Sequence, residues 1–128
     1  MKSVLIVDDN AAVRMLLADF VNVIFPHLHV YLAEDGAEGI VMANRQRPDL
    51  ILMDADMPAM NGYEAAELLK KEKITRHIPI VAISGAGQDN RMANNLRKVA
   101  NASLPKPFTA AELMQTMQDL LHMEMPYV

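Results

Sequence analysis

Short apolar runs alternate with amphipathic segments along most of the chain. Five runs have the length and the apolar character of strands buried on both faces: Val4–Val7, Val30–Ala33, Leu50–Met53, Ile80–Ile83 and the shorter Ala102–Leu104. After each run, apolar residues recur at intervals of three and four, which is the period of an α-helix. Five strands that alternate with five helices predict an α/β domain, with a parallel sheet covered by helices on both faces.

The predicted helices are defined by their ends and by their apolar faces. Pro26 ends the first helix, the turn Asp35-Gly36 precedes the second, and the second reaches the region Arg45–Arg47. Two helices begin with capping boxes, in which an N-cap side chain and a glutamate three residues later satisfy backbone N–H groups: Asn61 with Glu64, and Thr109 with Glu112. The residues expected to face the sheet are Val13, Leu16, Leu17, Phe20, Val21, Ile24, Ile40, Val41, Leu68, Leu69, Met92, Leu96, Val99, Leu113, Met114, Met117, Leu120 and Leu121.

Polar side chains stand where the predicted strands end. Asp8-Asp9 follows the first strand, Asp54 the third, Ser84 the fourth and Lys106 the fifth. In open α/β sheets, ligands bind in the crevice at the carboxyl ends of the strands. If these runs are neighbouring strands, three carboxylates, a hydroxyl and an ammonium converge on one place. Such a set suits a divalent cation together with a phosphoryl group.

Each of these residues also has a purely structural interpretation. Asp9 or Asn10 is a suitable N-cap for the first helix, the stretch Asp54–Pro58 favours a turn, a lysine is usually solvated, and a serine often caps a turn. A cap needs only one acid, however, and a second acid adds repulsion and desolvation cost that a bound cation removes. Mg²⁺, or Mn²⁺ in its place, takes one or two carboxylates plus phosphate oxygens and waters. Asp9 and Asp54 can supply these carboxylates, with Asp8 acting directly or through water.

The composition indicates one globular domain. The 128 residues are 52% hydrophobic and 22% charged, and the net charge of −4 does not give the basic footprint of nucleic-acid binding. No apolar stretch reaches the roughly 18 residues of a membrane span, and the first residues do not form a signal peptide. The lack of cysteine excludes disulfides and thiolate sites. We expect a cytoplasmic protein with no direct contact to nucleic acid or membrane, built from a domain at residues 1–123 and a short tail at residues 124–128.

The polar strand ends lie within motifs that resemble those of response-regulator receiver domains of two-component signalling. The motifs are Val7-Asp8-Asp9, Met53–Pro58 with Asn61-Gly62 behind it, Ile83-Ser84-Gly85 and Lys106-Pro107-Phe108. In this order they cover nearly the whole chain. The resemblance implies a three-layer, doubly wound, flavodoxin-like (βα)5 fold with strand order 2-1-3-4-5. It also implies a cis peptide bond before Pro107, which directs Lys106 into the site.

Carried over residue by residue, the resemblance assigns a role to each residue of the cluster. Asp54 would be the phosphoacceptor, with Asp8 and Asp9 as the acid pair. The metal ligands would be Asp9, Asp54 and the backbone carbonyl of Asp56, with Asp8 beside them. Lys106 would neutralise charge on the phosphoryl group, because positioning and electrostatics dominate this chemistry.

The switch that the resemblance implies differs here in one element. Ser84 would be the switch hydroxyl, but Ser103 stands three residues before the lysine, where receivers of this kind usually carry tyrosine or phenylalanine. A serine cannot fill the space of an aromatic side chain, which buries about 150–250 Å². We therefore expect the signal to pass through the Gly85–Asn90 loop, whose glycines ease rearrangement, and through the helix after it.

The resemblance implies a phosphoacceptor rather than a multiple-turnover enzyme. Its phosphoryl group would come from a sensor histidine kinase or a histidine phosphotransfer protein, and would be hydrolysed slowly. The phosphorylated form would act on a downstream protein target or on an output domain absent from this chain.

Three other functions agree less well with the residues. A haloacid-dehalogenase-type phosphatase would explain Asp54-Ala55-Asp56, but its motif lies on the first strand and gives Asp8-Asp9 no role. An interaction module that is never phosphorylated typically loses one of the acids or the lysine, and fold alone does not identify function. A flavodoxin-like cofactor protein needs a phosphate-binding loop rich in Ser, Thr or Gly after the first strand, which this sequence does not have.

Overall fold

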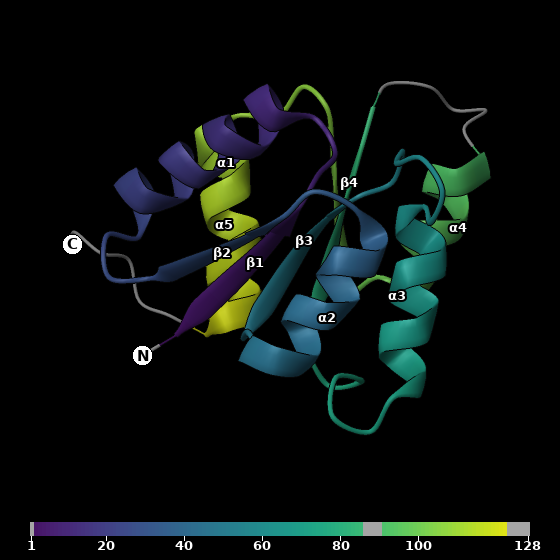
Figure 1. Ribbon diagram of the computed structural model, residues 1–128. Helices are drawn as coiled ribbons and strands as arrows, with labels where there is room; N and C mark the ends of the chain where they lie inside the picture. The colour runs from purple at the N-terminus through teal and green to yellow at the C-terminus, as the bar shows by residue number, and fades with distance from the viewer. Residues whose placement is uncertain (1, 86–90, 123–128) are drawn as a thin grey trace.

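The computed structural model describes residues 2–85 and 91–122, in which five strands alternate with five helices (Figure 1). The strands are β1 (Ser3–Val7), β2 (His29–Ala33), β3 (Leu50–Asp54), β4 (Ile80–Ser84) and β5 (Ala102–Pro105). The helices are α1 (Ala11–Ile24), α2 (Gly36–Gln46), α3 (Gly62–Lys71), α4 (Arg91–Val99) and α5 (Ala110–Leu121). Each strand is one residue longer than the apolar run that predicted it.

The strands form one parallel sheet in the order β2-β1-β3-β4-β5. This confirms the predicted doubly wound α/β fold and its strand order. Helices α1 and α5 cover one face of the sheet, and α2, α3 and α4 cover the other (Figure 1). Because β1 lies beside β3 and β3 beside β4, the residues that follow these three strands are neighbours at one edge of the sheet.

Each face of the sheet packs its own hydrophobic core. Side chains alternate along a strand, so Leu50 and Leu52 of β3 pack on the side of α1 and α5, whereas Ile51 and Met53 pack on the side of α2, α3 and α4. All five residues of β1, β3 and β4 are buried, while the edge strands β2 and β5 have exposed positions. Burial on both faces explains why the three inner strands are continuous apolar runs.

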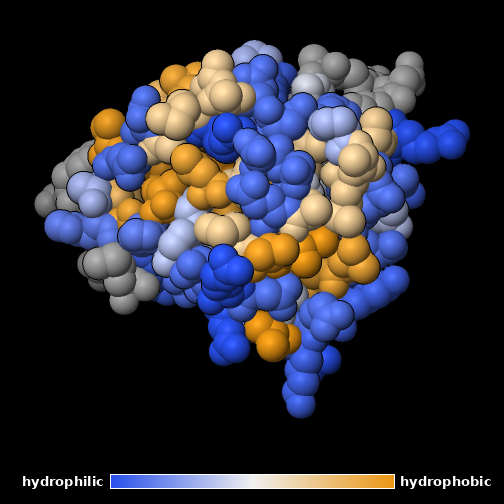
Figure 2. Space-filling view, viewed as in Figure 1, coloured by the Kyte–Doolittle hydropathy of each residue, from blue (hydrophilic) through white to orange (hydrophobic). Residues whose placement is uncertain are grey.

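Several residues predicted to face the sheet lie at the surface instead. Leu16 and Phe20 of α1, Val41 of α2, Leu68 of α3 and Met92 of α4 are exposed. Figure 2 shows hydrophobic side chains reaching the surface on the face where α2 and α3 lie. The prediction was wrong for these residues because a helix buries only one apolar stripe, and apolar residues at its margin remain in contact with water.

Helix α2 approaches the sheet through small residues rather than through Ile40 and Val41. Gly39 and Ala43 are buried, and a β-carbon on Gly39 would lie 3.0 Å from a methyl group of Val7. This close approach turns Val41 toward solvent, where 51% of it is exposed, and leaves Ile40 only partly buried.

Side-chain caps fix the points where the helices begin. The Asn10 side chain accepts a hydrogen bond from the backbone N–H of Val13 at the start of α1. Both predicted capping boxes are formed, at Asn61 and at Thr109. Asp35, predicted as part of a turn, is the N-cap of α2. Since Asn10 and Asn61 follow β1 and β3 closely, their caps fix the chain beside the strand ends.

Candidate functional site

Three carboxylates meet at the carboxyl ends of β1 and β3. Asp8 and Asp9 directly follow β1, and Asp54 is the last residue of β3. One carboxylate oxygen from each of the three lies within 4.8 Å of the others. Asp8 is 1% exposed and Asp54 5% exposed, whereas Asp9 is open to solvent. Buried like charges at this separation oppose one another, so the arrangement favours a bound cation.

Lys106 brings one positive charge to this cluster from the end of β5. Its Nζ lies 3.8 Å from Oδ2 of Asp8 and 3.8 Å from Oδ1 of Asp54. The Lys106–Pro107 peptide bond is cis, which confirms the prediction from the sequence. One ammonium cannot balance three carboxylates once all of them are ionised, and a divalent cation can supply the missing positive charge.

The acids perturb one another through burial and charge. Burial, followed by the nearby charge of Asp8, raises the pKa of Asp54 to about 7, against the opposing effects of Lys106 and the backbone N–H of Asp56. Burial also raises the pKa of Asp8, although a hydrogen bond from the backbone N–H of Asn10 opposes the shift. A strongly raised pKa in a buried carboxyl at a strand end is a frequent feature of functional sites.

Neighbouring groups hold the two buried acids in place. Oδ1 of Asp8 accepts a hydrogen bond from the backbone N–H of Asn10 at 2.9 Å, and the guanidinium of Arg14 donates to the Asp8 carbonyl at 2.6 Å. Asp54 is supported from α3, where Gly62 packs against its backbone. A β-carbon on Gly62 would lie 2.2 Å from the Asp54 carbonyl oxygen, so this approach requires glycine.

Ser84 is bound by an arginine that the sequence analysis did not single out. Ser84 ends β4 and is 1% exposed, and its Oγ accepts a hydrogen bond from Nη1 of Arg97 at 3.1 Å. The other terminal nitrogen of Arg97 donates to the Asn94 side chain. Arg97 lies in the last turn of α4, where a basic residue is ordinarily a solvated helix end, so its sequence position gave no signal.

The remaining predicted site residues lie on β5 and just after β3 and β4. Asp56 is exposed, and its backbone N–H is 3.4 Å from Oδ1 of Asp54. Ser103 is exposed on β5. Gly85 is half-buried, and apart from its chain neighbours no described residue has an atom within 4 Å of the position that a β-carbon would occupy. The rest of the predicted switch loop, residues 86–90, lies outside the described residues, as does the predicted tail.

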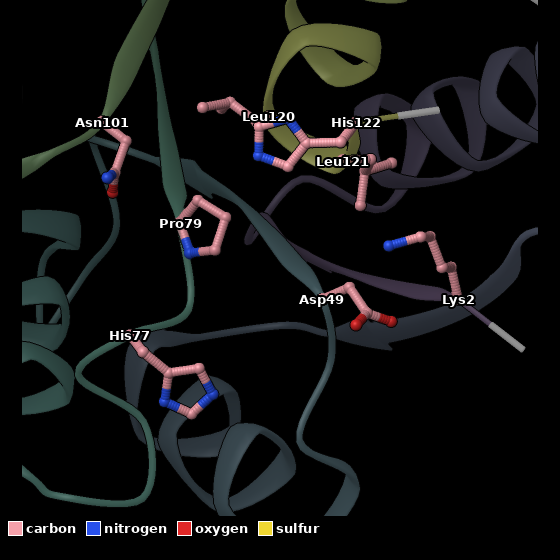
Figure 3. A pocket seen from close by; sticks show the side chains of 8 residues that line it. All are labelled: Lys2, Asp49, His77, Pro79, Asn101, Leu120, Leu121 and His122. Carbon is pink, nitrogen blue, oxygen red and sulfur yellow. The ribbon is translucent and has the colours of Figure 1, made fainter. Parts of the chain in front are cut away.

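A cavity of about 370 Å³ lies at the opposite end of the sheet (Figure 3). It is lined by Lys2, Asp49 and Asn101, which precede β1, β3 and β5, and by His77 and His122. Figure 3 shows the two imidazoles on separate parts of the chain, with His77 below Pro79 and His122 beside the end of α5. None of the clustered acids lines this cavity, so it is separate from the site at the carboxyl ends.

A sequence model of the response regulator receiver domain matches residues 4–118. The chain belongs to this family. As a receiver domain it is part of two-component signalling, and its family is one of phosphoacceptors. None of its described helices has the length and hydrophobicity that a membrane crossing requires.

Curated relatives of this receiver domain include short and long proteins. The chain is 32% identical to the protein PilH of Pseudomonas aeruginosa over 122 residues, covering 94% of this chain and 98% of PilH. It is 29% identical to the polar-differentiation response regulator DivK of Brucella anthropi over 120 residues, covering 94% and 96%. The phosphate regulon transcriptional regulatory protein PhoB of Pseudomonas aeruginosa is 31% identical, but this chain spans only 52% of it.

Solved receiver domains have the same fold. The receiver domain of a sensor histidine kinase of Pseudomonas aeruginosa superposes with a TM-score of 0.85 at 29% identity, over 95% of this chain and 98% of that one. That crystal structure has a magnesium ion coordinated in its active-site cleft. The chemotaxis protein CheY4 of Vibrio cholerae superposes with a TM-score of 0.81 at 27% identity, over 94% and 98%.

The residues of this chain fit a magnesium ion. The available donors are carboxylate oxygens, which are the hard ligands that Mg²⁺ prefers. Oδ2 of Asp8 is buried and accepts no hydrogen bond from any described residue, and the Lys106 ammonium at 3.8 Å is too distant to donate one. A buried oxygen without a donor is unfavourable unless a cation or an ordered water satisfies it. The acid cluster therefore has both the charge and the unsatisfied oxygen that a divalent cation requires.

Proposed function

We propose that Asp54 is the phosphoacceptor of this receiver domain. It takes its phosphoryl group from the phosphohistidine of a partner protein or from a small acyl phosphate. One observation carries the proposal: Asp54 is a buried carboxylate at the end of a central strand, close to two further carboxylates and to the Lys106 ammonium. In the transfer, an Asp54 oxygen bonds to phosphorus while the bond from phosphorus to the donor breaks. The electron pair of that bond stays with the imidazole nitrogen of a phosphohistidine or with the carboxylate oxygen of an acyl phosphate.

The proposed metal ligands are Asp9, Asp54 and the backbone carbonyl of Asp56, with Asp8 binding directly or through water. Oδ2 of Asp8 accepts no hydrogen bond from a described residue, which supports a cation in contact with this side of the cluster. When bound, Mg²⁺, or Mn²⁺ in its place, supplies positive charge next to the phosphoryl oxygens. The raised pKa values of Asp8 and Asp54 mean that the cation competes with protons for these oxygens.

Lys106 and Ser84 are proposed to stabilise the phosphoryl group. The Lys106 ammonium, 3.8 Å from Oδ1 of Asp54, is placed to pair with an oxygen of a phosphoryl group attached there. The Ser84 hydroxyl is buried at the end of the adjacent strand, which makes it the neutral hydrogen-bond donor for a second oxygen.

We further propose that the protein is a signalling switch rather than a turnover enzyme. Its donor is a sensor histidine kinase or a histidine phosphotransfer protein, and its readout is a downstream protein or an output domain. The relatives support this, because they include both short regulators such as DivK and receivers that are part of kinases. A cytoplasmic location and a receiver domain spanning residues 1–123 stay predictions.

The proposal is tested by labelling with acetyl phosphate and Mg²⁺, followed by intact-mass spectrometry. We expect one phosphoryl adduct on the wild type, none after chelation of the metal, and none on Asp54→Asn. The variant Asp19→Asn changes an exposed acid of α1 and serves as the matched control, so it should label like the wild type. Undiminished labelling of Asp54→Asn would show that another residue is the acceptor.

A further inference from the structure

The Ser84 hydroxyl is tied to α4 through Arg97. Nη1 of Arg97 donates to Oγ of Ser84 at 3.1 Å, and Nη2 donates to the side chain of Asn94, one turn earlier in the same helix. The planar guanidinium is therefore held between two acceptors, one at the end of β4 and one within α4. The Arg97 guanidinium, bound at both terminal nitrogens, has less freedom than that of a solvated arginine. Its position therefore depends on where Oγ of Ser84 lies.

The surroundings of this contact explain why an arginine reaches Ser84. Ala82 packs with Leu96 of α4 in one core, so Ser84, two residues along the strand, faces the same side of the sheet. Ser103 pairs in register with Ala82 and is exposed. On this flank β5 thus offers a short side chain, and the long half-buried side chain of Arg97 comes from the helix instead.

The chemistry of the pair leaves the serine proton available. An arginine only donates hydrogen bonds, whereas a serine hydroxyl accepts two and donates one. While Oγ of Ser84 accepts from Arg97, its own O–H stays available to a further acceptor at the carboxyl ends of the strands, where a phosphoryl group on Asp54 would lie. A hydrogen bond from a charged donor also strengthens the one that the hydroxyl makes in turn.

We propose that Arg97 is a positioning residue that orients Ser84 toward a phosphoryl group on Asp54 and passes its formation on to α4. This inference rests on the function proposed above. When the Ser84 hydroxyl donates to a phosphoryl oxygen on Asp54, Oγ shifts and the guanidinium of Arg97 follows its acceptor. Because Arg97 also holds Asn94, the last turns of α4 rearrange with it. Arg97 thereby couples the site to α4 in a protein that has serine, and no aromatic residue, at position 103.

The test compares the wild type with Arg97→Met, Arg97→Lys, Ser84→Ala and a control, Lys98→Met. Lys98 is an exposed neighbouring cation of α4, so its replacement removes a charge without touching Ser84. Each protein is treated with acetyl phosphate and Mg²⁺, the adduct is measured by mass spectrometry, and amide exchange of residues 91–99 is compared before and after labelling. The strands serve as an internal check that each variant is folded.

We expect labelling to change exchange in α4 of the wild type and of Lys98→Met. In Arg97→Met this change should fall by about tenfold, in keeping with the loss of a hydrogen bond from a charged donor. Arg97→Lys keeps one donor and should respond in between. The double variant Ser84→Ala/Arg97→Met should respond no less than Ser84→Ala alone, because the two residues act as one unit.

Two results would overturn the inference while leaving the proposed function intact: a wild-type response in labelled Arg97→Met, or additive effects in the double variant. If Arg97→Met does not fold, the exchange response of α4 is compared between Arg97→Lys and the control Lys98→Met. Equal responses of these two variants would refute the coupling. A wild type that takes no phosphoryl group overturns the proposed function itself.

Discussion

Among single residues, the site depends most on Asp54, whose carboxylate is buried in surroundings that disfavour a negative charge. Asp54 is buried beside Asp8, and their mutual repulsion is offset only in part by Lys106 at 3.8 Å from each. In the proposed function the same oxygens form the phosphoacceptor and the metal ligands, which accounts for this cost. Changes of charge, through pH, metal or substitution, should therefore affect these residues more clearly than changes of packing.

The pKa of Asp54, raised to about 7, predicts how stability depends on pH without metal. The folded state holds its proton at pH values where the unfolded state has lost it, so stability falls as pH rises from about 4 to about 7. Each pKa unit corresponds to about 1.4 kcal/mol, and we expect a loss of about 2–4 kcal/mol from this residue. Urea denaturation of wild type and Asp54→Asn in EDTA measures it.

We expect the free energy of unfolding of Asp54→Asn to fall less steeply with rising pH. At pH 8 this variant should be more stable than the wild type. Mg²⁺ should stabilise the wild type far more at pH 8 than at pH 5, because protons displace it at low pH. Parallel stability curves for the two proteins would contradict the raised pKa.

Removing the ammonium of Lys106 should separate metal binding from phosphoryl transfer. The Lys106 ammonium repels a cation bound at the acids, and Lys106→Met removes this repulsion. The affinity for Mg²⁺ should therefore rise about fivefold, the equivalent of about 1 kcal/mol for nearby charges in contact with water. Labelling by acetyl phosphate should slow at the same time. Calorimetric titration with Mg²⁺ gives the first quantity, with Lys98→Met as the control. A weaker affinity in Lys106→Met would be incompatible with the charge balance described.

At the scale of elements, the start of α3 and the end of β3 form one unit. The capping box at Asn61 sets the helix start, and Gly62 brings α3 onto the Asp54 carbonyl. This contact explains why a glycine stands directly behind the acidic strand end. It also means that the acceptor cannot be moved without moving α3.

A side chain on Gly62 should therefore damage the site through the backbone. In Gly62→Ala the added carbon would lie 2.2 Å from the Asp54 carbonyl oxygen, so strand and helix must separate. Overpacking of this kind typically costs about 1–3 kcal/mol, and labelling should slow as Asp54 shifts. Gly85→Ala is the matched control, because open space surrounds that position. Thermal unfolding distinguishes them, and equal losses in the two variants would argue against the contact.

The fifth strand and the β4–α4 connection should contribute unequally to the switch. Ser103 is exposed, so Ser103→Ala should leave the labelling-dependent exchange of α4 nearly unchanged. Gly85→Pro, which stiffens the chain directly after Ser84, should abolish it. Amide exchange on labelled proteins provides the comparison. A response destroyed by Ser103→Ala alone would place the switch on β5 instead.

At the scale of the whole molecule, the sequence predicted the sheet better than the helix surfaces. Inner strands are buried on both faces, so their apolar runs identified them directly, whereas the strand order came from the resemblance and not from the pattern. Helical periodicity placed Val41 and Leu68 inside, because it does not resolve the margin of an apolar stripe.

The candidate site was predicted where it depends on strand ends, and missed where it depends on helix surfaces. Asp8, Asp54 and Lys106 each follow a recognisable apolar run, and their convergence follows from the topology of a parallel sheet. Arg14 and Arg97 stand on helices among residues that are ordinarily solvated. Only the three-dimensional structure shows that the first donates to the Asp8 carbonyl and the second to Ser84.

The residue that carries the phosphoryl group decides every role proposed for the acid cluster. Borohydride reduces an aspartyl phosphate to homoserine, so peptide sequencing of labelled and reduced protein locates the acceptor without any mutation. We predict homoserine at position 54, formed only when Mg²⁺ is present during labelling, with Asp8, Asp9 and Asp56 unchanged. Homoserine at position 8, 9 or 56, or at none of these positions in protein that carries a phosphoryl group, would contradict the account.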